Sequence, residues 1–333
     1  IDPELIESAI HQMEFHRKEV TNSPYPYGLK LMLFVSGSWF HGGDPVKILR
    51  FDDYFKQLNA ELAKGNFFEN RIRKYLLDNP HRVLFKLIPD PHKEEKEAAR
   101  IEAELEAVKA RLTAEDIQAI RQDSKALQKL QESTEDLSVL PTLELADIPP
   151  LSLSVKESPK YSSDRMICYD QPTSGIFYFT AVAGVGKIPK HLIPLVPFFC
   201  QAFSKVGTAK SDYSEMARKI DRYTGGVGLS AHARTRFDDE GACLPFINFN
   251  GKCLVRNQEK LFEIMEELIC ELAFADLARL KNLFSEYRAG LESAVVQNGH
   301  GLAISLASRN FSLTRTLNEM WGGIHQLKTI IIK

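Results

Sequence analysis

A densely charged segment in the middle of the chain most constrains the fold. Residues 91–136 contain the run HKEEKEAARIEAELEAVKARLTAEDIQAIRQDSKALQKLQES, in which both charge signs are interspersed with single apolar residues. Apolar residues at spacings of four, three and four predict one helix: Ile101, Leu105, Val108 and Leu112. Thr113 and Asp116 form a capping-box pattern that predicts the start of a second helix, with Ile117, Ile120, Leu127 and Leu130 on one side. We therefore predict an antiparallel helical hairpin with a solvated outer face.

The hairpin divides the rest of the chain into three parts. Residues 1–90 mix helical and extended patterns, and the alternating run HRVLFKLIPD at 81–90 predicts a strand, so we expect the C-terminal part of an α+β domain. Residues 137–160 are rich in proline and serine and predict an extended linker. Residues 161–333 should form a second globular domain.

The last domain carries alternating strand and helix patterns. GIFYFTAVAG, VGLSAHARTR and CLPFINFNGKCLV predict strands, and HLIPLVPFFCQAFSKVG predicts a buried helix interrupted by Pro194 and Pro197. Long amphipathic runs such as SDYSEMARKIDRYTGG and NQEKLFEIMEELICEL predict further helices. The order of these elements predicts an α+β fold, with helices packed on one face of a mostly antiparallel sheet.

The stretch HQMEFH raises the question of a zinc site. The inverted zinc-protease signature is H-x-x-E-H, whereas here His11 and His16 lie five residues apart around Glu14. On a helix, residues five apart point roughly 140° away from each other, so both imidazoles cannot bind one ion. Phe15 occupies the position of the second ligand, and Met13 and Phe15 suggest a core-facing stripe instead. His41, before two glycines, has no second ligand near it. An autonomous metalloenzyme that uses these residues is therefore the least favoured hypothesis for this chain.

Composition excludes several classes of function. The 333 residues are 44% hydrophobic and 26% charged, with a net charge of -2. The sequence lacks the excess of basic residues that would indicate nucleic-acid binding. It also lacks the long apolar run that would indicate a membrane span. The five cysteines are scattered without a C-x-x-C pair, which favours a reducing compartment. GVGK at 184–187 lacks the first glycine and the final Ser or Thr of a phosphate-binding loop, so we expect a turn.

The two ends also give an expectation. The chain starts with Ile1 and closes on the apolar run TIIIK. We expect it to be an excised part of a longer protein.

Three runs together carry a family resemblance: YGLKLMLFVSGSWFHGGDPVKILRFDDYFKQLN, GNFFENRIRKYLLDNPHRVLFKLIPDP and VPFFCQAFSKVGTAKSDYSEMARKIDRYTGGVGLS. In this order, before and after a charged hairpin, they resemble the presequence-protease branch of the insulinase-like (pitrilysin-type) zinc metalloproteases. The resemblance implies four similar α+β domains of the metalloprotease-like α/β sandwich type, arranged as two halves of a clamshell joined by a hairpin. This chain would then contain the end of the second domain, the hairpin and the third domain.

The resemblance also implies where the catalytic residues lie. The zinc-binding H-x-x-E-H would be in the first domain, upstream of this chain, and FFCQAFSKVGT resembles a degenerate copy of it. Laying Gly207-Thr208 on the Gly-Thr that typically follows the motif puts Phe198, Gln201 and Ala202 at the positions of His, Glu and His. Phenylalanine and alanine have no lone pair for a metal. Because Phe198 lies in an apolar helix beside Phe199 and Phe203, we expect it to be buried in the core. We expect no catalytic residue, metal ligand or cofactor in this chain, and zinc only in the full-length parent.

The resemblance implies a non-catalytic portion of a zinc-dependent, oligopeptide-degrading endopeptidase that forms a chamber wall and a hinge. Its expected partners are the remaining domains of its own parent chain and unstructured peptides, without nucleic acid or membrane. The alternative is a stand-alone structural or interaction module with the same fold, and an upstream H-x-x-E-H on the same chain would decide between them. The expected compartment is the cytoplasm of a bacterium, or the mitochondrial or plastid matrix of a eukaryote.

Overall fold

The computed structural model describes residues 1–134, 137–151, 154–159, 163, 165–239 and 241–332. Contacts between Cα atoms divide the chain into two compact units, one formed by Ile1–Lys74 together with Gln171–Lys333 and the other by Tyr75–Asp170. Tyr161, the predicted start of the last domain, lies outside the described residues. The first 74 residues therefore belong with the C-terminal domain, which the sequence did not indicate.

The first segment is helical. Its helices are α1 (Pro3–Lys18), α2 (Tyr27–Trp39), α3 (Pro45–Leu49), α4 (Phe51–Leu62) and α5 (Phe67–Ile72). Asp2 caps α1 by accepting a hydrogen bond from the backbone N–H of Glu4 at 2.9 Å, as the Asp-Pro start of this helix predicts.

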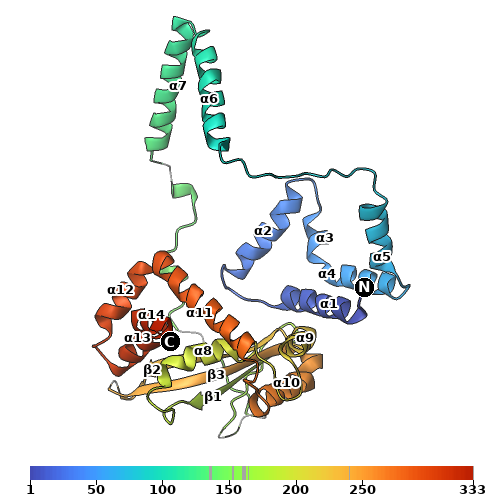
Figure 1. Ribbon diagram of the computed structural model, residues 1–333, viewed down its shortest axis with the longest axis vertical. Coiled ribbons are helices and arrows are strands. Elements are labelled where there is room, and N and C mark those ends of the chain that lie inside the picture. The colour runs from blue at the N-terminus through green and yellow to red at the C-terminus, as the bar shows by residue number, and fades with distance from the viewer. Residues whose placement is uncertain (135–136, 152–153, 160–162, 164, 240, 333) are drawn as a thin grey trace. The chain divides into compact units, whose positions relative to one another are not determined.

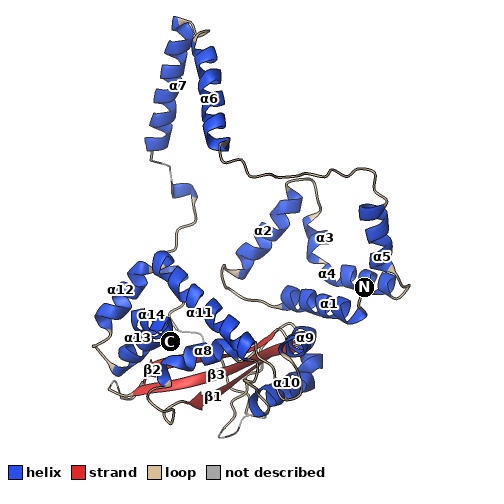
Figure 2. Cartoon of the chain, viewed as in Figure 1, coloured by secondary structure: helices blue, strands red, loops and turns tan. Residues whose placement is uncertain are grey.

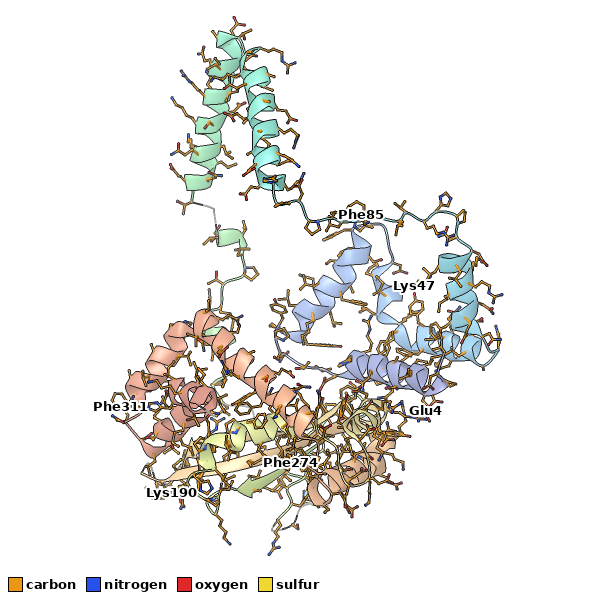
Figure 3. All side chains as sticks on the ribbon, viewed as in Figure 1. Glu4, Lys47, Phe85, Lys190, Phe274 and Phe311 are labelled. Atoms are coloured by element: carbon orange, nitrogen blue, oxygen red, sulfur yellow. The ribbon has the colours of Figure 1, made fainter. Side chains whose placement is uncertain are left out.

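The strand predicted over 81–90 is wrong. Residues 1–90 are all described and none of them is in a strand, so the segment expected to be α+β is helical followed by an extended stretch. Phe85 on this stretch is 81% exposed (Figure 3). Alternating residues form a strand only where a neighbouring strand pairs with their backbone groups, and no described segment pairs with this one.

The unit Tyr75–Asp170 contains the predicted hairpin. Helix α6 (Lys93–Lys109) and helix α7 (Ala114–Glu132) run in opposite directions from a short turn (Figure 1). The capping box is formed: Asp116 N–H donates to Thr113 Oγ1 at 3.2 Å, and Thr113 N–H donates to Asp116 Oδ2 at 2.9 Å. Leu105 and Leu130 remain 64% and 71% exposed, so the helices form without burying their apolar stripes.

We expect Thr113→Ala to destabilise the start of α7 by about 1 kcal/mol, because the backbone N–H of Asp116 loses its acceptor. Amide hydrogen exchange in the first turn of α7 should then become several-fold faster, with α6 unchanged. Thr113→Ser keeps the hydroxyl and is the matched control. Equal exchange in the alanine and serine variants would contradict the capping role.

The C-terminal domain is built on an antiparallel sheet. Strands β1 (Ile176–Gly184), β2 (Gly226–Thr235) and β3 (Cys243–Leu254) are arranged in the order β1-β3-β2 (Figure 2). Gly251 on the central strand lies opposite Phe179 of β1 and Val227 of β2. All three strands match the sequence prediction, and the α+β fold is confirmed.

Helices cover one face of this sheet. Those that contact the strands are α8 (Val196–Ala202), α9 (Tyr213–Tyr223), α10 (Gln258–Cys270) and α13 (Leu313–Gly322). The helices that pack against these are α11 (Leu277–Gln297), α12 (Gly299–Ser308) and α14 (Ile324–Ile332). The main core combines α9 and α10 with strand residues such as Phe249 and Cys253. A second core lies between α8, α13 and β2. None of the described helices is both long and apolar enough to cross a bilayer.

Two local features shape this packing. The helix predicted over HLIPLVPFFCQAFSKVG is shorter than expected, because a 3₁₀ turn at Ile193–Leu195 precedes α8 and Pro197 occupies its first turn. Gly251 lets α10 approach β3 closely, since a Cβ there would lie 2.9 Å from the Cδ1 atom of Leu261.

Candidate functional site

The face of the sheet opposite the helices carries polar side chains. Alternation along each strand sends Phe179 and Phe249 into the helix-covered core and turns their neighbours to the other side. We call that other side the open face; Tyr178 is 48% exposed on it. Its polar residues are Tyr178 and Thr180 on β1, Asn248, Asn250 and Lys252 on β3, and Ser230 and His232 on β2.

A chain of hydrogen bonds crosses the open face from β1 to β2. The Thr180 hydroxyl donates to Asn250 Oδ1 at 3.0 Å, and Asn250 Nδ2 donates to Ser230 Oγ at 3.3 Å. Because Ser230 accepts from Asn250, its own proton is available for His232 Nε2, 2.9 Å away. Asn250 is exposed and retains a second N–H for an external acceptor, so its amide can bind another peptide group.

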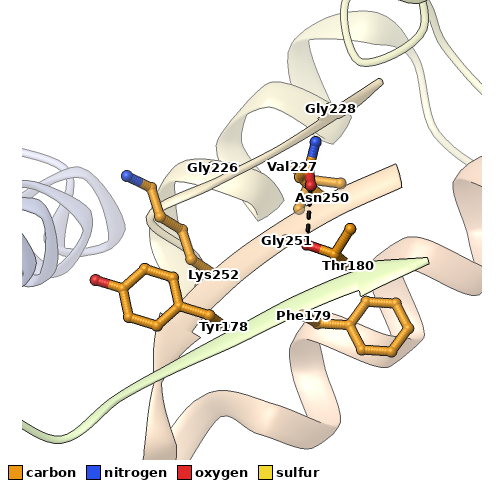
Figure 4. Close-up of a pocket in the computed structure, with 9 residues that line it drawn as sticks. All are labelled: Tyr178, Phe179, Thr180, Gly226, Val227, Gly228, Asn250, Gly251 and Lys252. Carbon is orange, nitrogen blue, oxygen red and sulfur yellow. Dashed lines mark hydrogen bonds between the residues drawn. The ribbon is translucent and has the colours of Figure 1, made fainter. Parts of the chain in front are cut away.

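A hollow of about 360 Å³ lies beside this chain (Figure 4). Gly226 and Gly228 of β2 form part of its lining, and a Cβ at either position would meet open space. Gly226 has φ +129°, a conformation that side-chain-bearing residues rarely adopt. The backbone of β2 is therefore accessible from the open face at these two residues.

The rim of the hollow is fixed by a residue from outside the sheet. Lys252 Nζ donates to Glu19 Oε1, just after α1, at 2.6 Å. Partial burial and the Glu19 carboxylate raise the pKa of Tyr178 above its usual value. One carboxylate thus holds the ammonium at the rim and acts electrostatically on the nearby phenol.

The residues predicted at degenerate metal-site positions lie elsewhere. Phe198, Gln201 and Ala202 are on α8, which packs on the helix-covered face through β2. The Phe198 ring packs edge-on against Phe284 with centroids 5.1 Å apart, and Ala202 is 1% exposed. Hydrocarbon side chains at two of the three positions do not fit a zinc ion.

Gly207 and Thr208, the anchor of that comparison, have a structural role. Thr208 Oγ1 and Ser211 Oγ each donate to Glu267 Oε1 at 2.7 Å, and Lys219 Nζ donates to Glu267 Oε2 at 2.9 Å. A Cβ on Gly207 would come within 2.8 Å of the Ser211 carbonyl oxygen. This loop ties α9 to α10 on the helix-covered side.

The two histidines of HQMEFH diverge as predicted. His11 is 6% exposed, whereas His16 is exposed to solvent, and Phe15 between them is fully buried. Met13, expected on the core-facing stripe, is 56% exposed. Across the described ranges, no three His, Cys, Asp or Glu side chains converge where a metal ion could bind.

We expect Phe198→Ala to destabilise the domain by about 2 kcal/mol, less than for a buried aromatic, because Phe198 is only half-buried. The prediction of a fully buried Phe198 is therefore corrected. Urea denaturation would measure the change, with Phe198→Leu as a control that keeps most of the apolar contact. A loss below about 0.5 kcal/mol would mean that the contact with Phe284 contributes little.

Comparison with known proteins identifies the family of this chain. The family model for the domain associated with peptidases of family M16, subfamily C, matches residues 87–331, which include the hairpin and nearly all of the sheet domain. The chain belongs to this peptidase-associated family. Relatives named presequence proteases confirm the resemblance to the presequence-protease branch.

The peptidase-associated chain also matches longer proteins. It is 30% identical over 332 residues to "Presequence protease, mitochondrial" of Xenopus laevis, covering 99% of this chain and 32% of that protein. It is 30% identical over 335 residues to "Presequence protease 1, chloroplastic/mitochondrial" of Arabidopsis thaliana, covering 98% and 31%. "Protein HypA" of Clostridium perfringens is 29% identical over 308 residues, covering 91% and 32%. The chain spans about a third of the length of these relatives.

Sequence reasoning missed the open face. The signal was available in the strand patterns, because Tyr178 and Thr180 alternate with phenylalanines in IFYFT, and Asn248 and Asn250 flank Phe249 in INFNG. Alternation of this kind indicates one buried face and one solvated face. The involvement of Glu19 was not readable, since it comes from a distant segment.

Proposed function

We propose that this chain is a non-catalytic portion of a zinc-dependent, oligopeptide-degrading endopeptidase. The zinc and its H-x-x-E-H would come from another part of the same parent chain. The match to the peptidase-associated family and the presequence-protease relatives support this proposal. Phe198, Gln201 and Ala202 support it too, since they could neither hold a metal nor activate a water.

We propose that the open face forms part of the wall of the degradation chamber. The main support is the hydrogen-bonded row of Thr180, Asn250 and Ser230, which places side-chain donors and acceptors on an uncovered sheet face. Such groups can bind the backbone of an extended peptide of any sequence, as a wall for unstructured peptides requires. The hairpin would serve as the hinge between the two halves.

The compartment follows the source of the protein. Relatives named for mitochondria or chloroplasts support the matrix of either organelle in a eukaryote, and the cytoplasm stays our proposal for a bacterial source. The remaining domains of the parent and unstructured peptides are the proposed partners.

The test uses the longer protein and a fluorogenic unstructured peptide. Asn250→Leu should raise KM several-fold with kcat nearly unchanged, because Asn250 would bind peptide without touching the reacting bond. Asn310→Leu, on an exposed turn between α12 and α13, is the matched control. An unchanged KM in Asn250→Leu would remove the wall role.

A second measurement tests the non-catalytic assignment. Purified alone, the chain should carry well under one equivalent of zinc after dialysis and should not cleave the peptide. Stoichiometric zinc with chelator-sensitive hydrolysis, abolished by His11→Ala, would contradict it. Without an upstream H-x-x-E-H on the parent chain, the stand-alone interaction module would be the better hypothesis.

A further inference from the structure

Helix α1 docks onto the sheet domain through one aromatic anchor. Phe15 is fully buried against Ile176 at the start of β1 and Leu254 at the end of β3. Its ring occupies the space above Gly225, where a Cβ would collide with it. Any side chain at position 225 would therefore exclude Phe15 from this pocket.

Side chains of α1 also satisfy the end of helix α9. The last carbonyl groups of a helix have no partner within it. The His11 Nδ1–H donates to the Asp221 carbonyl at 3.1 Å, and Gln12 Nε2 donates to the same oxygen and to the Thr224 carbonyl, the latter at 2.9 Å. Polar residues of α1 thus act as a cap for α9.

The charges on the two sides are complementary. Arg256 binds both carboxylate oxygens of Glu14, with Nη1–Oε1 at 3.0 Å and Nη2–Oε2 at 2.6 Å. The helix contributes acidic residues and the domain contributes basic ones. The other pairs are Glu4 and Glu7 with Arg222, and Glu19 with Lys252.

Fewer buried residues hold α1 on the domain than hold the core of the domain together. Only His11 and Phe15 of α1 are buried, whereas the main core joins two helices and two strands through fully buried residues such as Met216 and Leu268. Local openings require less free energy where fewer apolar groups are buried. The exposed pairs of Glu4 and Glu7 with Arg222 add little to that free energy, whereas the bidentate contact between Glu14 and Arg256 adds more.

We propose that α1 is a detachable clasp: residues 1–19 dock on the groove formed by the end of α9, Gly225 and Arg256, and undock as a unit while the sheet domain stays folded. The occupant of the groove is an acidic helix with one phenylalanine, supplied by the same chain. The match to the peptidase-associated family begins only at residue 87, so the clasp lies outside it.

Undocking would change the rim of the hollow. Glu19 would leave Lys252 and Tyr178, and the Lys252 ammonium would become available to a carboxylate on the open face. This consequence rests on the proposed function, whereas the clasp itself does not. The test below contains no peptide, so its failure is distinct from a failure of the wall role.

The test measures amide hydrogen exchange in the whole 333-residue chain. Arg256→Glu places two carboxylates face to face and should accelerate exchange in α1 about tenfold, while β3 keeps its protection. The swap E14R/R256E should restore most of the protection, limited by Lys18 one turn from the new arginine. Arg234→Glu, the same charge change at the far end of β2, should leave α1 unchanged.

The outcomes separate the possibilities. Slow exchange of α1 in Arg256→Glu would show that the charged contacts do not hold the clasp. Loss of protection in α1 and β3 together would show that α1 is part of the cooperative core. Failure of the swap to restore protection, with β3 intact, would show that the pair is not the determinant. Each of these results would overturn the proposal.

Discussion

Replacing Glu319 by leucine is expected to lower the free energy of unfolding of the sheet domain by about 3 kcal/mol. Glu319 on α13 is 1% exposed, and its carboxylate accepts hydrogen bonds from the Ser305 hydroxyl of α12 and from His325 Nδ1 at 3.2 Å. The backbone N–H of His325 donates to it at 3.3 Å, near the start of α14. Leucine would leave these donors without an acceptor, and a buried unpaired donor costs about as much as several net hydrogen bonds.

Thermal and urea unfolding followed by circular dichroism would measure this loss, which corresponds to a fall in Tm of roughly 6 to 12 °C for a domain of this size. Glu319→Gln keeps the shape and one acceptor oxygen, so it should lose clearly less. Ser305→Ala removes a single donor and should cost about 1 kcal/mol. If Glu319→Leu and Glu319→Gln were equally stable, the hydrogen bonds would not be what holds α12, α13 and α14 together.

The Glu319 variants also differ in their dependence on pH. Burial raises the pKa of Glu319, but the hydrogen bonds from Ser305 and His325 outweigh it, so the pKa lies below the usual value. The stabilisation is therefore present above about pH 4.5 and is lost as the pH falls. Glu319→Leu should be less sensitive to acid than the unchanged chain.

Local signals in the sequence predicted much of the fold. The Thr113 capping box and the β1, β2 and β3 patterns each depend on residues within one short segment, and each is formed. Phe15 was correctly expected to lie on a core-facing stripe of its helix. Met13 was expected beside it, yet α1 rests on the domain along a strip too narrow to cover both.

Contacts between distant segments were not predictable in the same way. The 81–90 run has the composition of a strand, but a strand needs a partner that its own residues do not specify. Docking of α1 depends on Gly225 and Arg256, which lie far along the chain. For the site, the resemblance indicated that Phe198 and Ala202 stand at metal-ligand positions without being able to bind a metal. The polar open face could not be predicted in this way, because it depends on which side of the sheet the helices cover.

Lowering the pH from 7 to 4 is expected to weaken the docking of α1 before the domain unfolds. Two groups in the clasp, His11 and Glu14, have pKa values that docking lowers. Burial lowers the pKa of His11 below 6.5, and the bidentate contact with Arg256 lowers the pKa of Glu14 to about 2 despite its partial burial. Arg256 and Glu14 are the charged groups that act on His11. Arg256 and Lys18 are those that act on Glu14.

The hydrogen bonds of His11 explain the sign. Its Nδ1 must carry a proton for the Asp221 carbonyl, and its Nε2 accepts from Asn257 Nδ2 at 3.3 Å, so the docked imidazole is neutral. A second proton would place two donors face to face. Both depressed pKa values mean that undocked α1 binds more protons, so docking weakens as the pH falls, first through His11 below about 6.5 and then through Glu14 below about 4.5.

At pH 4 only part of the Glu14 effect is reached. The full fall in pKa from 4.5 to about 2 corresponds to about 3 kcal/mol, which solvent around the half-exposed Arg256 reduces, and going from pH 7 to pH 4 removes less than about 1 kcal/mol of it. Hydrogen exchange of α1 at pH 7, 6, 5 and 4, corrected for intrinsic rates, would measure it against β3 in the same sample. His11→Asn keeps a donor for the Asp221 carbonyl without a titrating ring, so it should flatten the change between pH 7 and 5 and leave the lower step. Equal profiles for both chains, or tighter docking at pH 5, would assign the His11 contacts no part in holding α1.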